Sequence, residues 1–347
     1  MNKYEKPAEL YDGLRLHQNE NTGGCSPRVL EALASIRADE VCLYPPYASV
    51  SATCAEYLNV DPDRLSLVNG LDEGIMALAV GYLRPSANCL LPEAIIPEPA
   101  FEIFAFDTEV VGGRVVRVLP RPDFSFPLDE VVAAITPNTR VVFLTNPNNP
   151  TGQIVPIEAI RTIAGRVPAG AVVFIDEAYA EFSGETFIPE LPSFPNVIVG
   201  RTFSKAFGLA GIRIGAITGD PAALEPVRLA VPLYSVNIAA VVALRAALGD
   251  RAFMEDYLRQ VRESKALLYS ACDLLGIAYW KSEANFVLVR AGAHLARLMD
   301  GAAARGIYLR DRSTEPGCEG CLRITAGIVE HTKRVIAVMD EVLCGAR

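Results

Sequence analysis

The sequence contains, at residues 201–215, the stretch Arg201-Thr-Phe-Ser-Lys-Ala-Phe-Gly-Leu-Ala-Gly-Ile-Arg-Ile-Gly215. Within it Lys205 lies eight residues before Arg213, and the hydroxyls of Thr202 and Ser204 lie just upstream. A lysine that forms a Schiff base with a phosphorylated partner needs an anchor for the phosphate. Hydroxyls, backbone N–H groups and an arginine provide one. The stretch therefore predicts a site for pyridoxal phosphate (PLP), with a solvated lysine in a loop as the alternative.

The overall composition predicts an ordinary globular protein. The 347 residues are 51% hydrophobic and 21% charged, which suits about two domains with large cores. The net charge is −9 and like charges do not form long runs, so we expect neither a nucleic acid nor an acidic membrane surface as a partner. The first ten residues lack the apolar core of a signal peptide, and no segment reaches about 18 uninterrupted apolar residues. We therefore expect a cytoplasmic protein.

The eight cysteines are scattered along the chain, which fits reduced thiols better than a disulfide framework. Cys318 and Cys321 have the spacing of a metal-binding pair, but no second pair accompanies them. The three histidines lie far from this pair in the sequence. We therefore expect no metal site.

Short apolar runs rich in Val and Ile predict strands that are buried on both faces. These runs cover residues 65–68, 110–118, 141–144, 171–175, 197–199 and 212–217. Helical patterns lie between several of them, at residues 27–37, 49–58, 72–83 and 156–166. Strands that alternate with helices predict an α/β fold with an open, mostly parallel central sheet flanked by helices. Ligands of such sheets bind at the carboxyl ends of the strands.

The pattern changes after residue 237. Long helices are expected at residues 238–248 and 253–275, strands at 284–289 and 321–325, and a final helix at 329–343. We expect three parts: an N-terminal arm at residues 1–26, a large PLP-binding domain at 27–236, and a smaller C-terminal α+β domain at 237–347. The arm is expected to complete the smaller domain.

Two polar clusters follow predicted strands. Residues 146–152 read Asn-Pro-Asn-Asn-Pro-Thr-Gly and follow the run at 141–144, and Asp176-Glu-Ala-Tyr179 follows the run at 171–175. Each cluster alone could be a turn or a helix cap. Their order along the chain, ahead of Lys205 and Arg213, instead predicts one shared site at the carboxyl edge of the sheet.

PLP chemistry needs these residue types. The Asp176 carboxylate would keep the pyridine nitrogen protonated, and Asn149 and Tyr179 would donate hydrogen bonds to the phenolic oxygen. Lys205 would form the Schiff base and move the proton. The phosphate would be held by Arg213, by the hydroxyls of Thr202 and Ser204, and by the N-terminus of the helix that starts near Asp72.

From about Leu16 to Val338 the sequence resembles the histidinol-phosphate aminotransferase family, within the PLP-dependent aminotransferases of fold type I, class II. The motifs that carry the resemblance are Gln18-Asn-Glu-Asn21, Leu43-Tyr-Pro45, Asn69-Gly-Leu-Asp-Glu73, Pro99-Ala-Phe101, residues 146–152, 176–179 and 202–215, Val236-Asn237 and residues 321–327. Two further stretches, Gly306-Ile-Tyr-Leu-Arg-Asp311 and Gly320-Cys-Leu-Arg-Ile-Thr325, point more narrowly to histidinol phosphate as the substrate.

The resemblance implies an enzyme of histidine biosynthesis. Such an enzyme exchanges an amino group between L-histidinol phosphate and 2-oxoglutarate by a ping-pong route, and yields imidazole acetol phosphate and L-glutamate. The resemblance also implies a homodimer with shared active sites, in which the N-terminal arm joins the small domain and the dimer partner.

The resemblance further assigns roles to residues outside the lysine stretch. Arg310 and Arg323 would bind the anionic end of the substrate, and Asn21 would also contact the substrate. Tyr44 would reach the cofactor phosphate of the partner subunit, and Phe101 would stack on the pyridine ring. The position before Asp72 often carries a small or hydroxyl residue in the family, so Leu71 would bind the phosphate through its backbone.

Three alternatives remain open at this point. An aromatic amino-acid aminotransferase or a threonine-phosphate decarboxylase would use the same PLP residues. Residues 321–327 favour the transaminase over the decarboxylase. A PLP-binding regulator without turnover would be expected to carry an appended DNA-binding or partner domain, for which the chain has no room.

Overall fold

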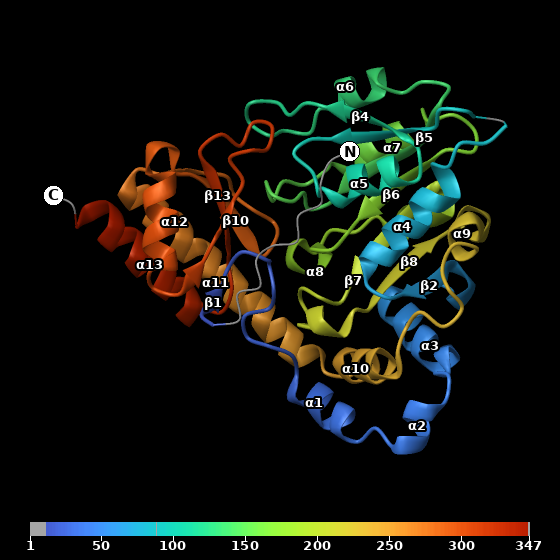
Figure 1. Cartoon of the computed structure of the whole chain (residues 1–347), viewed down its shortest axis with the longest axis horizontal. Helices are drawn as coiled ribbons and strands as arrows, with labels where there is room; N and C mark the ends of the chain where they lie inside the picture. Colours follow the sequence, from blue (N-terminus) through green and yellow to red (C-terminus); the bar gives the residue numbers. More distant parts are fainter. Residues whose placement is uncertain (1–11, 88, 346–347) are drawn as a thin grey trace.

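The structure is a computed structural model that describes residues 12–87 and 89–345. In these ranges a seven-stranded sheet lies at the centre of the larger part of the molecule, in the order β2–β8–β7–β6–β5–β3–β4 (Figure 1). Its strands are β2 (Leu65–Val68), β3 (Glu93–Pro97), β4 (Arg114–Val118), β5 (Thr139–Thr145), β6 (Val172–Asp176), β7 (Val197–Thr202) and β8 (Gly215–Gly219). Strand β8 is antiparallel to both of its neighbours, whereas β4, β3, β5, β6 and β7 pair in parallel. The prediction of a mostly parallel sheet is confirmed.

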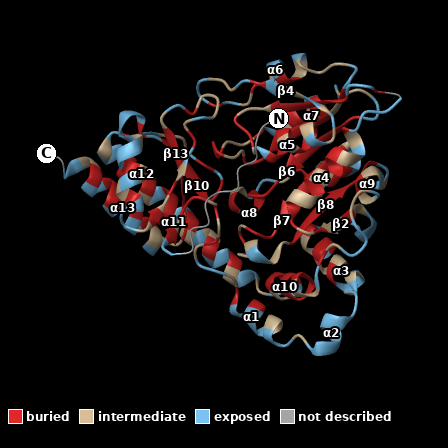
Figure 2. Ribbon diagram, viewed as in Figure 1, coloured by how far each residue is buried: buried red, intermediate tan, exposed pale blue. Residues whose placement is uncertain are grey.

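Alternate residues of the central strands pack into two separate cores, as the pleat requires. In β5, Val141 and Phe143 pack with residues of α4, α5 and α9, whereas Val142 and Leu144 pack into the core on the other face. Both faces of the strand are therefore buried, at a gain of roughly 1.5–3 kcal/mol for each large apolar side chain. This is why the strand reads as a continuous apolar run. Figure 2 shows the buried residues concentrated in the sheet and in α10.

Helices cover both faces and the lower end of this sheet (Figure 1). They are α1 (Pro27–Ala34), α2 (Ala38–Cys42), α3 (Tyr47–Leu58), α4 (Leu71–Tyr82), α5 (Ile103–Val110), α6 (Leu128–Ala133), α7 (Ile157–Ala164), α8 (Ala180–Ser183), α9 (Pro221–Arg228) and α10 (Ile238–Leu248). Short 3-10 turns are η1 (Pro62–Arg64), η2 (Ile188–Ser193), η3 (Ala210–Ile212) and η4 (Gly292–His294). No helix of the described ranges is both long and apolar enough to cross a membrane.

The rest of the chain forms a second unit around a smaller antiparallel sheet. Within the described ranges its order is β12–β13–β10–β9, with β9 (Ala278–Tyr279), β10 (Phe286–Arg290), β12 (Arg310–Asp311) and β13 (Cys321–Thr325). The long helix α11 (Arg251–Leu275) and helices α12 (Leu295–Ala303) and α13 (Val329–Cys344) pack with it. Strand β1 (Leu14–Arg15) pairs in parallel with β11 (Ile307–Tyr308), so the start of the described chain joins this unit. Helix α10 packs against α1 and α3, and the domain boundary at residue 237 stays a prediction.

The element boundaries differ from the sequence predictions at several places. The apolar run 110–118 is not one strand, because α5 ends at Val110 and a turn with Gly112 at φ 91° precedes β4. The run 212–217 begins as a 3-10 turn, and Arg213 adopts a left-handed conformation with φ 58° and ψ 65° before β8 starts at Gly215. Strand β3 was not predicted, because prolines surround it and a buried carboxylate, Glu93, opens it.

Candidate active site

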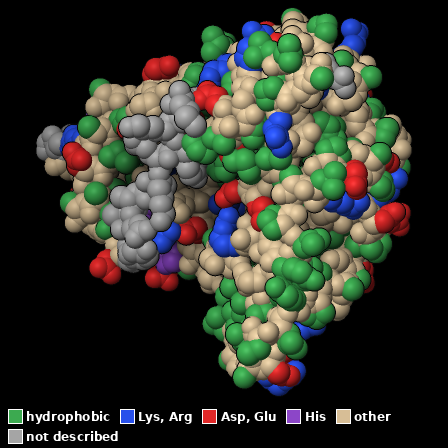
Figure 3. All heavy atoms as spheres, turned by 45° about the vertical axis from the view of Figure 1, so that its right-hand side comes forward, with side chains coloured by type: hydrophobic (Ala, Val, Ile, Leu, Met, Phe, Trp, Pro, Cys, Tyr) green, Lys and Arg blue, Asp and Glu red, His purple; other side chains and the backbone are tan. Residues whose placement is uncertain are grey.

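A cavity of about 500 Å³ lies where the carboxyl ends of β5, β6 and β7 meet the smaller sheet. The last residues of these three strands, Thr145, Asp176 and Thr202, all line it. Its volume is in the usual range for a site that encloses a cofactor and a small substrate. Figure 3 shows acidic and basic side chains close together in the hollow between the two lobes of the molecule.

Lys205 lies in the loop that follows β7, and its Nζ donates a hydrogen bond to the Gln18 backbone oxygen at 3.0 Å. Burial, with the nearby charge of Arg323, lowers the pKa of Lys205 to about 8. A lysine with such a pKa is partly neutral near physiological pH, and the neutral amine is the nucleophilic form. Lys205 therefore has the properties of a Schiff-base lysine.

Asp176 ends β6 and is buried, and its Oδ1 accepts a hydrogen bond from the Ala178 N–H at 2.9 Å. Burial, with a smaller contribution from Asp72, raises the pKa of the Asp176 carboxyl from 3.8 to about 7. A buried carboxyl of this kind gains most from a cationic N–H group beside it. The protonated pyridine nitrogen of PLP is such a group.

Asn149 and Tyr179 also reach the cavity. The Asn149 Oδ1 accepts a hydrogen bond from the Arg323 guanidinium, and the Tyr179 hydroxyl accepts one from Asn19 Nδ2 at 3.0 Å. The Tyr179 ring packs edge-on against Phe286, with the ring centres 5.2 Å apart. Both side chains are therefore fixed, with the Asn149 amide N–H₂ and the Tyr179 O–H left as donors.

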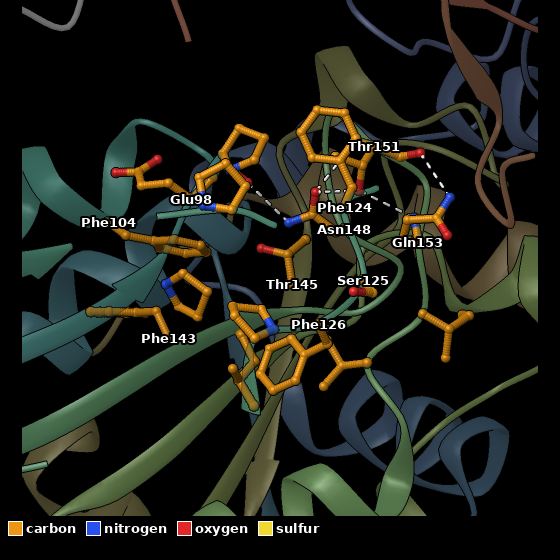
Figure 4. A pocket seen from close by; sticks show the side chains of 18 residues that line it. Glu98, Phe104, Phe124, Ser125, Phe126, Phe143, Thr145, Asn148, Thr151 and Gln153 are labelled. Atoms are coloured by element: carbon orange, nitrogen blue, oxygen red, sulfur yellow. Dashed lines mark hydrogen bonds between the residues drawn. The ribbon is translucent and has the colours of Figure 1, made fainter. Parts of the chain in front are cut away.

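Hydrogen bonds of Asn148, the residue before Asn149, hold the loop that carries both residues; Figure 4 shows them. Asn148 Nδ2 donates to the Pro99 oxygen at 3.1 Å, and its Oδ1 accepts from the Thr151 hydroxyl at 2.8 Å. The space behind this loop is lined by Phe104, Phe143 and other apolar side chains, and its volume is about 40 Å³. It has room for about one water molecule, so it serves as packing for the loop.

The residues predicted to hold a phosphate gather at one end of the cavity. The Ser204 N–H donates to Thr202 Oγ1 at 3.2 Å, and the Thr202 hydroxyl donates to Ser204 Oγ at 3.0 Å. Arg213 Nη2 pairs with Asp72 Oδ2 at 2.9 Å. Helix α4 starts at Leu71, and in the described structure its first turn has no side-chain cap, so backbone N–H groups are available to an anion.

Gly70 leaves room for the Arg213 guanidinium at the phosphate-binding end of the cavity. Gly70 precedes α4 with φ 77°, and a Cβ at this position would lie 2.4 Å from Arg213 Nη2. Any other residue would displace the guanidinium. The free N–H groups, the hydroxyls and the guanidinium together fit a phosphate group, and the Asp176 carboxyl fits the pyridine nitrogen. These residues therefore fit PLP.

Arginines form another wall of the cavity. Arg323 is only 5% exposed, donates to the His17 oxygen at 2.6 Å, and lies over the Phe286 ring at 5.3 Å. Burial, with the nearby charge of Arg312, lowers the pKa of Arg323 to about 9. Arg310 is its partner in the β12–β13 pairing, so both predicted substrate arginines share this wall. A planar guanidinium pairs with a carboxylate or a phosphate through two hydrogen bonds.

Residues 16–19 link the arginine wall to the lysine loop. Three of the four contact a predicted site residue, and the fourth contacts Thr325, which belongs to the same strand as Arg323. The Leu16 oxygen accepts from the Thr325 hydroxyl at 2.9 Å, and the His17 oxygen accepts from Arg323. The Gln18 oxygen accepts from Lys205, and Asn19 donates to Tyr179. This segment therefore runs between β13 and the lysine loop.

Of the remaining predicted site residues, Phe101 lies in the cavity, whereas Asn21 and Tyr44 do not. Phe101 lines the cavity, where it packs edge-on against Phe104 with ring centres 6.0 Å apart. Asn21 is not among the lining residues, since its Nδ2 donates to the Ala206 oxygen at 3.0 Å and its Oδ1 accepts from the Gly23 N–H. Tyr44 is 74% exposed, outside the cavity of its own chain, and stacks on Tyr234 at 4.1 Å. The sequence leaves open whether Tyr4 or Tyr11 of the N-terminal arm contacts the substrate, and both lie outside the described residues.

The cavity also contains residues that the sequence did not single out as site residues. They include six charged or polar residues: Arg15, His17, Asn19, Glu20, Glu102 and Arg312. Burial, together with the charges of Arg15, Arg310 and Arg323, lowers the pKa of His17 to about 4, so its ring is neutral at physiological pH. Arg312 could have been predicted from the sequence Arg310-Asp-Arg312. Side chains two residues apart on a strand lie on the same face, so Arg312 is expected to face the cavity together with Arg310.

The chain matches the family model described as aminotransferase class I and II over residues 11–338. It is 36% identical over 338 residues to a histidinol-phosphate aminotransferase of Symbiobacterium thermophilum, an alignment that covers 96% of this chain and 91% of that protein. It is 34% identical over 340 residues to the enzyme of the same name from Moorella thermoacetica, with coverages of 96% and 86%.

Solved structures give the same fold. The crystal structure of a histidinol-phosphate aminotransferase from Sinorhizobium meliloti, in complex with pyridoxal-5'-phosphate, superposes with a TM-score of 0.88 at 24% identity, and covers 100% of this chain and 96% of that one. An aspartate aminotransferase from Thermus thermophilus, with maleate, superposes with a TM-score of 0.80 at 22% identity, with coverages of 96% and 92%. At these identities the likeness concerns the fold.

Proposed function

The chain belongs to the class I and II aminotransferases, and from this we propose that it transfers an amino group between L-histidinol phosphate and 2-oxoglutarate with PLP as its cofactor. The products are imidazole acetol phosphate and L-glutamate, and the reaction belongs to histidine biosynthesis. The observation that carries the substrate is the pair Arg310 and Arg323, adjacent across two strands in the cavity that holds Lys205. This pair suits a substrate with an anionic end.

Bound PLP would supply an electron-withdrawing ring that stabilises the negative charge developing at the substrate's Cα. The Asp176 carboxylate would keep the ring nitrogen protonated, and this would strengthen that effect. Asn149 and Tyr179 would donate hydrogen bonds to the phenolic oxygen. Arg213, Thr202, Ser204 and the first turn of α4 would hold the phosphate, with contacts that do not change during the reaction.

Lys205 is the residue that moves the proton. As a neutral amine its Nζ accepts the proton from the substrate's Cα, and as an ammonium it returns a proton in the next step. The Gln18 oxygen, 3.0 Å away, stabilises the ammonium through a hydrogen bond. Arg323, held by the His17 oxygen and Asn149, binds the anionic end and fixes the distance between Cα and Lys205.

The donor is tested by a half-reaction with the purified, PLP-loaded protein. We expect L-histidinol phosphate to shift the cofactor's absorbance to that of the aminated form at least about tenfold faster than L-phenylalanine at equal concentration. The phosphate brings three oxygens and up to two negative charges to the arginine wall, whereas the carboxylate of phenylalanine brings two oxygens and one charge. Conversion mainly by phenylalanine would make the protein an aromatic aminotransferase. Release of CO₂ from threonine phosphate without a keto-acid acceptor would make it a decarboxylase.

We also propose that the chain is a homodimer with shared active sites. An exposed apolar patch supports this proposal, and it includes Leu43, Tyr44, Leu229, Leu233 and Tyr234. Hydrophobic side chains cover much of the lower lobe in Figure 3, where α1 and α2 lie. Patches of this kind on a folded protein are typical of protein–protein interfaces. In such a dimer Tyr44 would donate a hydrogen bond to the cofactor phosphate held by the other subunit.

The expected result for Tyr44→Phe is a loss of roughly 10-fold to 100-fold in PLP affinity, the effect of removing one hydrogen bond to a charged group. Tyr279→Phe is the matched control, since its hydroxyl lies near Asp273 outside the cavity, and should leave the affinity unchanged. Sedimentation velocity should give twice the mass of one chain. A fully active monomer with unchanged PLP affinity in Tyr44→Phe would refute both parts of the proposal.

A further inference from the structure

Glu102 faces two of the cavity arginines across the gap between the two units. Its Oε1 lies 3.9 Å from Arg310 Nη2 and 3.9 Å from Arg312 Nη1. The two guanidiniums therefore converge on one carboxylate oxygen, and both distances exceed those of a hydrogen bond. Glu102 comes from the N-terminal end of α5, whereas Arg310 and Arg312 come from β12 and the residue after it. The point of convergence lies in the cavity that holds Lys205.

Arg312 is fixed in this position. The residue is 5% exposed, and its backbone N–H donates to the Cys321 backbone oxygen at 3.0 Å. Its side-chain Nη2 pairs with Glu315, which is itself largely buried. Its other terminal nitrogen, Nη1, is the one directed at Glu102. The Glu102 side chain, by contrast, is 43% exposed and makes no contact with these arginines shorter than 3.9 Å. The arginine is thus rigid, and the carboxylate can be displaced.

We propose that Glu102 and Arg312 control the binding of the substrate's anionic group: Glu102 is an internal anion that this group replaces, and Arg312 is a further arginine that binds the group and favours a phosphate. The proposal rests on the proposed function, since it concerns the anionic end of the amino donor. It assigns to the site a preference for a phosphate over a carboxylate.

The preference follows from the charges that are exchanged. When a substrate carboxylate replaces Glu102, one negative charge replaces another, and the arginines gain little. A phosphate brings up to two negative charges and three oxygens, so it engages Arg310 and Arg312 together and still offers an oxygen to Arg323. Both anions displace the same carboxylate, so removing Glu102 should tighten both by a similar factor. Removing Arg312 should harm the phosphate more.

The test compares Glu102→Gln and Arg312→Gln with wild type in the two half-reactions, with L-histidinol phosphate and L-glutamate as donors. We expect Glu102→Gln to lower the KM for glutamate and the KM for histidinol phosphate by a similar factor of about 3-fold to 10-fold, because both donors displace the same carboxylate. Arg312→Gln should raise the KM for histidinol phosphate about 10-fold to 100-fold, and that for glutamate clearly less. The value of kcat should change less than about threefold in either variant, because neither residue approaches the reacting atoms.

The matched controls are Glu255→Gln and Arg259→Gln, exposed residues of α11 that do not line the cavity, and both should behave as wild type. Calorimetric titration of the PLP-loaded protein with inorganic phosphate and with acetate gives a second readout that needs no turnover. The phosphate-to-acetate ratio of affinities should fall in Arg312→Gln, whereas in Glu102→Gln both affinities should rise and their ratio should stay the same.

An unchanged phosphate-to-carboxylate ratio in Arg312→Gln would overturn the inference, as would unchanged affinities in Glu102→Gln or parallel losses of kcat for both donors. If the wild-type protein converts no anionic donor, the proposed function fails. In that case the titration with phosphate and acetate still decides whether Glu102 and Arg312 control the binding of the anion.

Discussion

Replacing Lys205 by alanine is expected to lower the rate of amino-group transfer by at least about 10⁴-fold, because both the nucleophilic amine and the group that moves the proton are lost. The chain should still fold. Within residues 12–87 and 89–345 the Lys205 side chain makes one hydrogen bond, to the Gln18 oxygen, and its loop is held independently by Thr202 and Ser204. The measurement is single-turnover conversion of L-histidinol phosphate, with circular dichroism to verify the fold.

Lys205→Arg separates charge from chemistry. It keeps a cation in the cavity, but a guanidinium does not deprotonate near neutral pH, so we expect it to be as inactive as the alanine variant. Lys281→Ala, a substitution of an exposed lysine outside the cavity, should retain full activity. An alanine variant at Lys205 that turns over at more than about a hundredth of the wild-type rate would refute the role assigned to this lysine.

Replacing Asp176 by asparagine should lower kcat by roughly 10³-fold, since the ring nitrogen of the cofactor loses its buried counter-charge. Asparagine keeps the shape and can still accept the Ala178 N–H hydrogen bond. The loss is therefore expected in kcat rather than in folding. Asp129→Asn is the control, since the Asp129 side chain is 94% exposed, and it should leave kcat unchanged.

The same substitution should stabilise the protein when PLP has been removed. Burial raises the pKa of Asp176 from 3.8 to about 7, so the contribution of this carboxyl to stability is fully present below pH 4 and is lost as the pH rises through 7. An asparagine side chain does not ionise, so the stability of the variant does not fall in this pH range. Urea unfolding at pH 8 should find the cofactor-free variant more stable by up to about 4 kcal/mol, and the gap should shrink toward pH 4. A variant that is less stable than wild type at pH 8 would contradict this.

The sequence predicted the central strands well where both faces of a strand are apolar. Strands β5 and β6 gave continuous Val/Ile runs, and these runs were correct to within two residues at each end. Strand β3 gave no such signal because its first residue, Glu93, is buried against Arg114 and Thr136, partners that come 21 and 43 residues later. A buried charge satisfied by distant residues is invisible to a local pattern.

The site residues also divide into those that the sequence predicts and those that it does not. Asp176, Tyr179 and Lys205 follow strands, so the rule that parallel strands end at a common edge places them together. His17, Glu102 and Arg312 lie in the cavity only because separate segments meet there. The position of Glu102, for example, depends on how α5 faces β12, which no spacing in the sequence encodes. Arg310 and Arg323 were predicted from the family resemblance alone, and their pairing across β12 and β13 supplies the physical reason.

The segment at residues 16–19 has a consequence for how the molecule is made. Its contacts with Thr325 and Arg323 span 309 and 306 residues of chain, and those with Lys205 and Tyr179 span 187 and 160. Strand β13 follows the seven-stranded sheet by about a hundred residues, so the contacts with Thr325 and Arg323 wait until almost all of the chain has left the ribosome. Closing so long a loop is also slow. The newly made protein therefore acquires its sheet first and its reactive centre last.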